Sequence, residues 1–145
     1  MPDIEISMQV LAFDFGLARI GVAVGQSITS TASPLETLAA KQGVPDWSKI
    51  ESLILTWKPN LLLIGEPINM DTSDQLITKK ARKFANQLHG RFGLKTELMD
   101  ERLSSVAARE EIFEYGGYNK LKKTKIDSVA AALILESWFS VQNHS

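Results

Sequence analysis

The feature that most constrains this chain is the segment Val10–Val24, in which two apolar runs enclose Asp14, Gly16 and Arg19. The apolar runs predict two consecutive strands that are buried on at least one face. Asp14 then lies near the end of a central strand, where a carboxylate is costly to desolvate. Such a charge has a cation, a set of donors or a metal as its partner, or it accepts backbone N–H groups in the tight turn to Gly16. The segment by itself leaves both interpretations open.

The composition limits the classes of protein to which the chain can belong. Its length predicts a single domain, residues 1–145, with frayed ends at 1–7 and 141–145. The absence of cysteine excludes disulfides, zinc–thiolate sites and thiol nucleophiles. No apolar run approaches the roughly 18 residues of a membrane span, and the acidic first residues lack the basic flank of a signal peptide. We therefore expect a cytoplasmic protein without membrane contact. Because the net charge is −1, nucleic-acid binding would need local basic patches.

Hydrophobic periodicity predicts an α/β fold with a mixed five-stranded sheet flanked by helices. The first three strands form an antiparallel meander, and the last two are parallel strands that follow helices. Right-handed crossovers should bring the ends of strands one, four and five to a common rim. The strands are expected within residues 10–24 (two strands), 28–38, 61–65 and 95–99, and the helices within 46–58, 77–92, 104–113 and 125–140.

Acidic residues recur at the predicted rim. Asp14 ends the first strand, and Asp100 and Glu101 follow the fifth. Asp127 shares a helix face with small residues, so it should point toward the sheet. Thr124-x-x-Asp127 also has the form of a capping box, which would explain Asp127 without catalysis. Capping does not explain why acids also end two strands, so the pattern favours a three-cornered acidic site.

Three neighbouring carboxylates repel one another unless a cation is present. Mg²⁺ or Mn²⁺ prefers oxygen ligands, and one or two such ions could activate water against a phosphodiester. Neither histidine lies in a segment that reaches this centre. Strand alternation does not decide which of Asp100 and Glu101 faces the site, because a strand end is loosely defined.

Four segments of the chain together resemble the YqgF/RuvX family of RNase H-like proteins, whose members are described as Holliday-junction resolvases or pre-16S rRNA nucleases. They follow the family's order and span most of the chain. The segments are Phe13-Asp-Phe-Gly16 with Arg19-Ile-Gly-Val-Ala-Val24, Gly65-x-Pro-Ile-Asn-Met-Asp71, Asp100-Glu-Arg-Leu-Ser-Ser105 and Lys125-x-Asp-Ser-x-Ala-Ala131.

The resemblance implies an RNase H-like nuclease domain with Asp14, Glu101 and Asp127 as catalytic metal ligands. It also implies that Arg19, Asn69 and Arg102 position the substrate.

The chain departs from the family at two positions. Glu66 stands where the family usually has Leu, and Thr72 stands where it usually has Gly. Glu66 is either a further ligand or an exposed loop charge, and we favour the exposed charge. Thr72 makes a positive φ less favourable at that position, so we expect the loop to differ in shape from that of the family.

These features predict a metal-dependent endonuclease that acts on structured nucleic acid. From the family, precursor 16S rRNA in ribosome biogenesis is the first substrate and a four-way DNA junction the second. We expect Mg²⁺ or Mn²⁺ as cofactor, pre-ribosomal particles as a further partner, and a monomer or weak dimer. Basic residues would neutralise backbone phosphates, or they form an ordinary solvated surface. They are Lys79, Lys83, Lys120, Lys122, Lys123 and Lys125.

Two other classes of function compete with the nuclease. ATPases of the actin and sugar-kinase superfamily also carry an Asp-x-Gly turn in their first hairpin, but they need two such domains. A non-catalytic ribosome-assembly factor would keep the fold and bind RNA without cleaving it. The Asp14-Phe-Gly16 tripeptide is not a kinase signature, because the rest of that set is absent.

Overall fold

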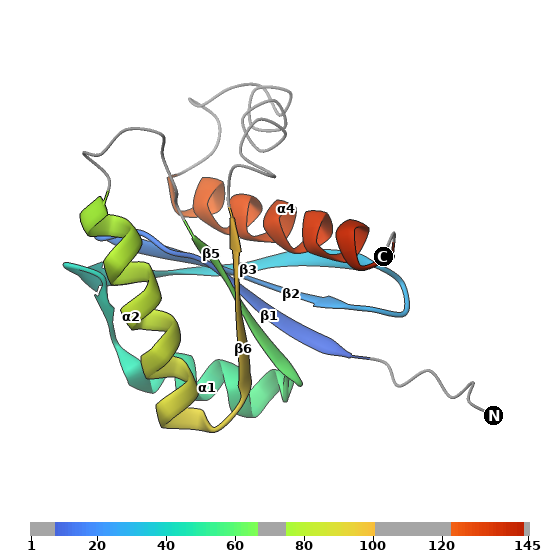
Figure 1. Ribbon diagram of the computed structural model, residues 1–145, viewed down its shortest axis with the longest axis horizontal. Coiled ribbons are helices and arrows are strands. Elements are labelled where there is room, and N and C mark those ends of the chain that lie inside the picture. The colour runs from blue at the N-terminus through green and yellow to red at the C-terminus, as the bar shows by residue number, and fades with distance from the viewer. Residues whose placement is uncertain (1–7, 67–74, 101–122, 144–145) are drawn as a thin grey trace.

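The computed structural model describes residues 8–66, 75–100 and 123–143. The sheet has six strands in the order β4-β3-β2-β1-β5-β6 (Figure 1). β1, β2 and β3 pair antiparallel, whereas β5 pairs parallel to β1 and β6 parallel to β5. The strands are β1 (Gln9–Asp14), β2 (Arg19–Gln26), β3 (Thr31–Lys41), β4 (Val44–Pro45), β5 (Leu61–Glu66) and β6 (Lys95–Asp100), and the helices are α1 (Trp47–Trp57), α2 (Gln75–Phe92) and α4 (Lys123–Asn143).

The mixed sheet and its meander are confirmed, but the expectation of five strands is wrong by one. The added strand, β4, pairs with Ala40 and Lys41 at the end of β3. Gln42 and Gly43 reverse the chain with positive φ angles of 53° and 83°. A strand of two residues carries no periodic pattern, so the sequence predicted only a loop here.

Helices cover both faces of the sheet, with α1 and α2 on one face and α4 on the other (Figure 1). Side chains of β1 alternate between the two layers. Leu11 and Phe13 pack in the α1/α2 layer, while Val10 and Ala12 lie on the α4 side. Asp14 therefore continues the series that faces α4.

The long helix α2 has the predicted apolar stripe. Ala81, Phe84, Ala85 and Leu88 are buried, and the Phe84 ring lies 5.6 Å from Phe13, 5.4 Å from Phe15 and 5.8 Å from Trp47 between ring centroids. On the other side of the helix, Lys79, Arg82, Lys83 and Asn86 are exposed. The 3.6-residue period was sufficient to predict which side of this helix is buried.

The helix α4 approaches β2 closely at Gly21. A Cβ atom added to Gly21 would lie 2.0 Å from the carbonyl oxygen of Asp127. Ala131 and Ile134, which follow Asp127 on the predicted inner face, are buried. Because Gly21 has no side chain, the first turns of α4 can lie this close to β2. The helix continues to Asn143, into the segment expected to be a frayed end.

The N-cap of α1 gives a test of pH dependence. Asp46 accepts hydrogen bonds from the Oγ (2.6 Å) and backbone N–H (3.0 Å) of Ser48, which lower the pKa of its carboxyl below the ordinary 3.8. A lowered pKa stabilises the fold above the unfolded value, and this contribution disappears as the pH falls through the folded value. We expect Asp46→Ala to be less stable than the parent at neutral pH, and the difference to shrink in acid. Urea unfolding at several pH values measures this.

The matched control for this test is Asp46→Asn, which keeps an acceptor at the cap and does not titrate. Its stability difference from the parent should stay smaller than that of Asp46→Ala at neutral pH. An Asp46→Ala deficit that is the same at all pH values would contradict the assignment.

None of the helices in the described part of the chain is both long and apolar enough to cross a membrane.

Candidate active site

Asp14 lies at the carboxyl end of β1, between two glycines. Its register partner on β2 is Gly21 and its partner on β5 is Gly65. Directly paired residues project to the same face of a sheet, and a glycine projects nothing. The Asp14 carboxylate therefore stands on the α4 face without a side chain beside it on either neighbouring strand.

Asp127 is brought to the same place by the first part of α4. Its backbone contacts Gly21, the register partner of Asp14. Its Oδ2 accepts a hydrogen bond of 2.7 Å from Nε of Arg19, the first residue of β2. The Asp127 side chain is 22% exposed and that of Arg19 is 43% exposed. The structure thus groups two of the predicted carboxylates with a guanidinium at one partly open edge.

The orientation of β6 indicates which member of the Asp100/Glu101 pair faces Asp14. Met99 packs in the α4 layer, and Glu97 accepts a 2.8 Å hydrogen bond from Nε1 of Trp138 on α4. Asp100 therefore points to the opposite face by strand alternation. Of the Asp100/Glu101 pair, Asp100 is not the residue that faces Asp14.

The remaining predicted site residues cannot be placed. Glu101 lies outside the described residues, and the side chain of Lys123, at the start of α4, is not described. Within residues 8–66, 75–100 and 123–143, no group of three or more histidine or acidic side chains is arranged to hold a metal. The other predicted residues outside the described ranges are Asn69, Thr72, Arg102, Lys120 and Lys122.

The prediction that Glu66 is an exposed loop charge is wrong. Glu66 is the last residue of β5, is 7% exposed, and accepts a hydrogen bond from Nε of Arg82 on α2. Leu62 and Ile64 of the same strand pack in the α1/α2 layer, so Glu66 faces that layer and not the Asp14 side. The strand runs one residue further than its apolar run, and a partner on another element was not visible in the local pattern.

The residues grouped around Asp14 suit a hard divalent cation. Carboxylate oxygens are the ligands that Mg²⁺ prefers, and Asp14 and Asp127 supply them from two elements. The ion pair with Arg19 engages Oδ2 of Asp127, and Oδ1 is not part of that contact. Two carboxylates and a partly exposed edge fit a metal that keeps several water ligands.

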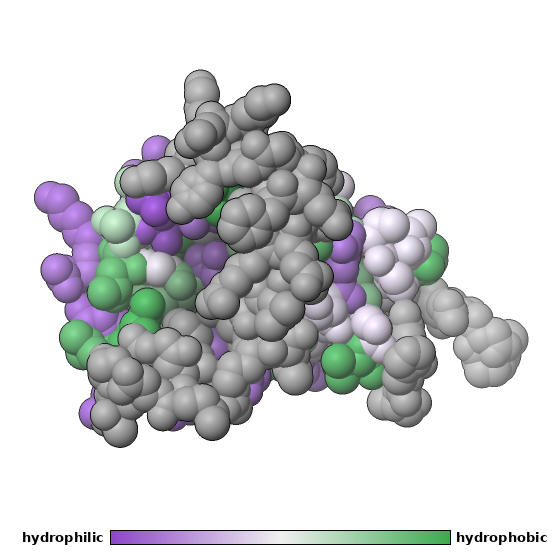
Figure 2. Space-filling view, turned by 90° about the horizontal axis from the view of Figure 1, so that it is seen from above, coloured by the Kyte–Doolittle hydropathy of each residue, from purple (hydrophilic) through white to green (hydrophobic). Residues whose placement is uncertain are grey.

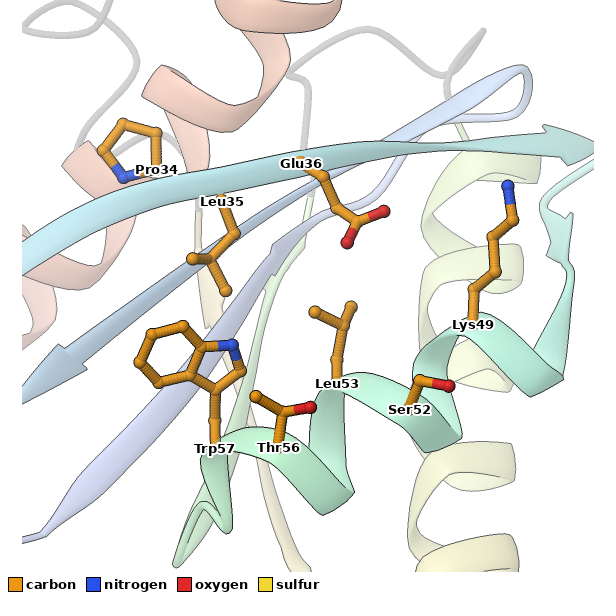
Figure 3. A pocket seen from close by; sticks show the side chains of 8 residues that line it. All are labelled: Pro34, Leu35, Glu36, Lys49, Ser52, Leu53, Thr56 and Trp57. Atoms are coloured by element: carbon orange, nitrogen blue, oxygen red, sulfur yellow. The ribbon is translucent and has the colours of Figure 1, made fainter.

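A separate cavity of about 550 Å³ lies between β3 and α1, on the sheet face opposite α4 (Figure 3). Leu35, Leu53 and Trp57 form its apolar part, with Glu36 on the strand side and Lys49 on the helix side. It holds neither of the grouped carboxylates. Its size alone does not make it the functional site.

Comparisons with known proteins show the family to which the chain belongs. A protein-family model described as RuvX, Holliday junction resolvase, matches residues 8–141. The chain is 59% identical over 134 residues to a protein of Histophilus somni, covering 92% of this chain and 95% of that protein. It is 53% identical over 137 residues to a protein of Pectobacterium carotovorum, covering 94% and 99%. Both carry the name "Putative pre-16S rRNA nuclease".

Solved structures of low identity share the fold. RuvC of T. thermophilus in complex with a Holliday junction substrate matches with a TM-score of 0.62 at 15% identity, covering 95% of this chain and 97% of that one. The fowlpox virus Holliday junction resolvase matches with a TM-score of 0.54 at 13% identity, covering 92% and 99%. The expected RNase H-like α/β fold is confirmed.

Proposed function

Because the chain belongs to the RuvX family, we propose that it is a metal-dependent nuclease that hydrolyses phosphodiester bonds in structured nucleic acid. The observation that carries the proposal is the convergence of Asp14 and Asp127 on one edge through Gly21. An Asx turn or a helix cap explains each acid separately. Neither explains why both acids lie together beside a guanidinium.

In this proposal, Asp14 and Asp127 hold one or two Mg²⁺ or Mn²⁺ ions together with Glu101. A metal held by these residues would supply an activated water and a positive charge opposite the cleaved phosphate. Arg19, whose Nε pairs with Asp127, would contact a phosphate through its remaining guanidinium N–H groups. Asn69 and Arg102 position the substrate, and Lys122 and Lys123 neutralise backbone phosphates.

Precursor 16S rRNA is the first substrate in this proposal, because relatives that share more than half of their residues with this chain are named as nucleases of pre-16S rRNA. A four-way DNA junction is the second, because a junction-bound resolvase shares the fold. The protein would act in the cytoplasm, on rRNA or on pre-ribosomal particles. Cleavage of a symmetric junction would require two active sites and hence a dimer.

The experiment is cleavage of an end-labelled precursor rRNA fragment and a four-way DNA junction in Mg²⁺, Mn²⁺ or EDTA. We expect cutting of the rRNA fragment that depends on the divalent metal and stops in EDTA. Cutting of the junction alone would make a DNA junction the substrate and would leave the proposed metal-dependent hydrolysis unchanged. Binding of both probes without cleavage in any metal would contradict the proposed nuclease activity. It would favour a non-catalytic ribosome-assembly factor that binds RNA.

Arg19 allows the proposed metal site to be tested without cleavage. The guanidinium competes with a cation for the Asp127 carboxylate, and the pair is partly exposed. We expect Arg19→Gln to tighten Mn²⁺ binding about two- to fivefold, the range of an exposed ion pair. Isothermal titration of the nucleic-acid-free protein measures this.

The control for the Arg19 titration is Arg91→Gln, which removes a guanidinium that lies over the Trp47 ring, 4.2 Å from its centroid. It should leave Mn²⁺ binding unchanged. Equal Mn²⁺ affinity in the parent and Arg19→Gln would show that Arg19 and the metal do not compete for the Asp127 carboxylate.

A further inference from the structure

We propose that a groove between α2 and the β3–β4 turn, edged by two lysines, binds the sugar–phosphate backbone of the substrate a few nucleotides from the cleaved bond. The inference rests on the proposed nuclease function and adds a second contact region to it. The groove has a volume of about 160 Å³. It is lined by Gln42, Gly43, Val44, Lys80, Lys83 and Gln87.

The chemistry of this lining suits phosphate groups. Two ammonium groups, from Lys80 and Lys83, and two side-chain amides, from Gln42 and Gln87, supply N–H donors. No carboxylate is among the lining residues described for the groove. The nearest acid along the chain, Asp46, is engaged with Ser48 at the cap of α1. The charged residues among those described as lining the groove are therefore both positive.

One of the two lysines is already held in place. Nζ of Lys80 donates to the backbone oxygen of Gln42 at 3.2 Å and lies 3.5 Å from its Oε1. An ammonium group has three N–H donors, so these contacts leave one for a ligand. Because the side chain is restrained before binding, less rotamer entropy is lost when a phosphate arrives. This distinguishes Lys80 from a freely rotating surface lysine.

The groove is joined to the loop that follows Asp14. The backbone N–H of Gly43 donates to the oxygen of Leu17 at 2.9 Å, and Gly43 lies on the Phe15 ring, where an added Cβ would be 2.6 Å from Cζ. Residues 14 and 17 are at most about 10 Å apart along the chain. Since a nucleic-acid strand in a duplex carries a phosphate about every 3.4 Å of axis, one strand can span both places.

Further basic residues lie on the same helix. Figure 2 shows hydrophilic residues, interspersed with hydrophobic ones, on the side where Figure 1 places the β3–β4 turn and the start of α2. Lys79 and Lys83, exposed on α2, belong to the same helix as Lys80. A backbone that leaves the carboxylates toward α2 would meet these lysines in succession.

The test compares two variants that each lose two positive charges. Lys80→Gln/Lys83→Gln removes both ammonium groups of the groove. Lys58→Asn/Lys95→Gln removes two exposed charges that precede β5 and begin β6, at the opposite edge of the sheet. Asn is chosen at position 58 because Lys58 has a left-handed backbone with φ of 47°, which Asn tolerates. Thermal unfolding confirms that each variant is folded.

Fluorescence anisotropy with the cleaved substrate then gives affinity as a function of salt. We expect the groove variant to bind about 10-fold more weakly at low salt, and its log–log salt slope to fall by about 1.4–1.8, the value for two lost phosphate contacts. In cleavage, KM should rise with kcat little changed, because the lost contacts are far from the reacting atoms. Lys80→Arg/Lys83→Arg should restore affinity.

The outcomes separate the groove from the nuclease itself. A groove variant that matches the Lys58→Asn/Lys95→Gln control in affinity and salt slope, while the parent cleaves, would overturn the groove alone. A parent protein that neither binds nor cleaves the rRNA fragment or the junction would overturn both proposals. Loss of kcat at unchanged KM would also overturn the groove, because it would place these lysines at the chemical step.

Discussion

Asp14→Asn is expected to lower the rate of metal-dependent cleavage by about 10²–10⁴-fold while leaving substrate binding within a few-fold of the parent. In the proposed site, the substitution would remove one anionic ligand while keeping the size and shape of the side chain. A ligand of a catalytic metal contributes several kcal/mol to transition-state stabilisation, and each 1.36 kcal/mol is a factor of ten in rate. Single-turnover cleavage with saturating protein measures the chemical step directly.

Two comparisons make the Asp14 result specific. Asp127→Asn should show a loss of the same order, because it would remove a second ligand of the same site. Glu66→Gln changes an acid at the end of the adjacent strand that faces the opposite layer, and it should cleave at a rate near the parent's. If Glu66→Gln lost as much activity as Asp14→Asn in folded protein, the site would be wrongly located. Undiminished cleavage by Asp14→Asn would exclude Asp14 as a ligand.

Gly21→Ala is the second change with a large expected effect. The added Cβ would lie 2.0 Å from the Asp127 carbonyl oxygen and 2.3 Å from its carbonyl carbon. Both are backbone atoms, so no side-chain rotation can relieve the overlap, and α4 must move away from β2. Overpacking of this kind costs about 1–3 kcal/mol and occasionally more. We expect a loss of stability at the upper end of that range, measured by urea unfolding.

Activity should fall together with stability in Gly21→Ala, because the displaced segment carries Asp127. The matched control is Gly90→Ala. Gly90 lies on an exposed part of α2, and an added Cβ there meets nothing within 4 Å. Alanine is better than glycine in a helix by about 0.5–1 kcal/mol, so this variant should be slightly more stable than the parent and fully active. A Gly21→Ala protein as stable as the parent would show that α4 does not depend on this close approach.

The local sequence pattern was sufficient to predict those structural features that depend on residues only a few positions apart. The apolar runs around Asp14 predicted β1 and β2, and the helical period predicted which side of α2 is buried. The cap at Asp46 is equally local, since its side chain accepts from a residue two positions later. The small residues after Asp127 likewise predicted that this acid faces the sheet. Each of these features depends on periods of two or 3.6 residues, which a sequence displays directly.

The sequence by itself therefore determined the mixed sheet and the buried faces, and it indicated the two acids that the structure groups, Asp14 and Asp127. Only the tertiary structure showed which charged side chains pair with one another. Arg19 and Asp127 are 108 residues apart, and Glu66 is paired with Arg82 on another element. The local pattern also could not predict which face a side chain at a strand end would take, because a shift of one residue turns it to the other face. That is why Glu66 proved to be buried, and why Asp100 was separated from Asp14 only once Met99 and Glu97 were seen to face α4.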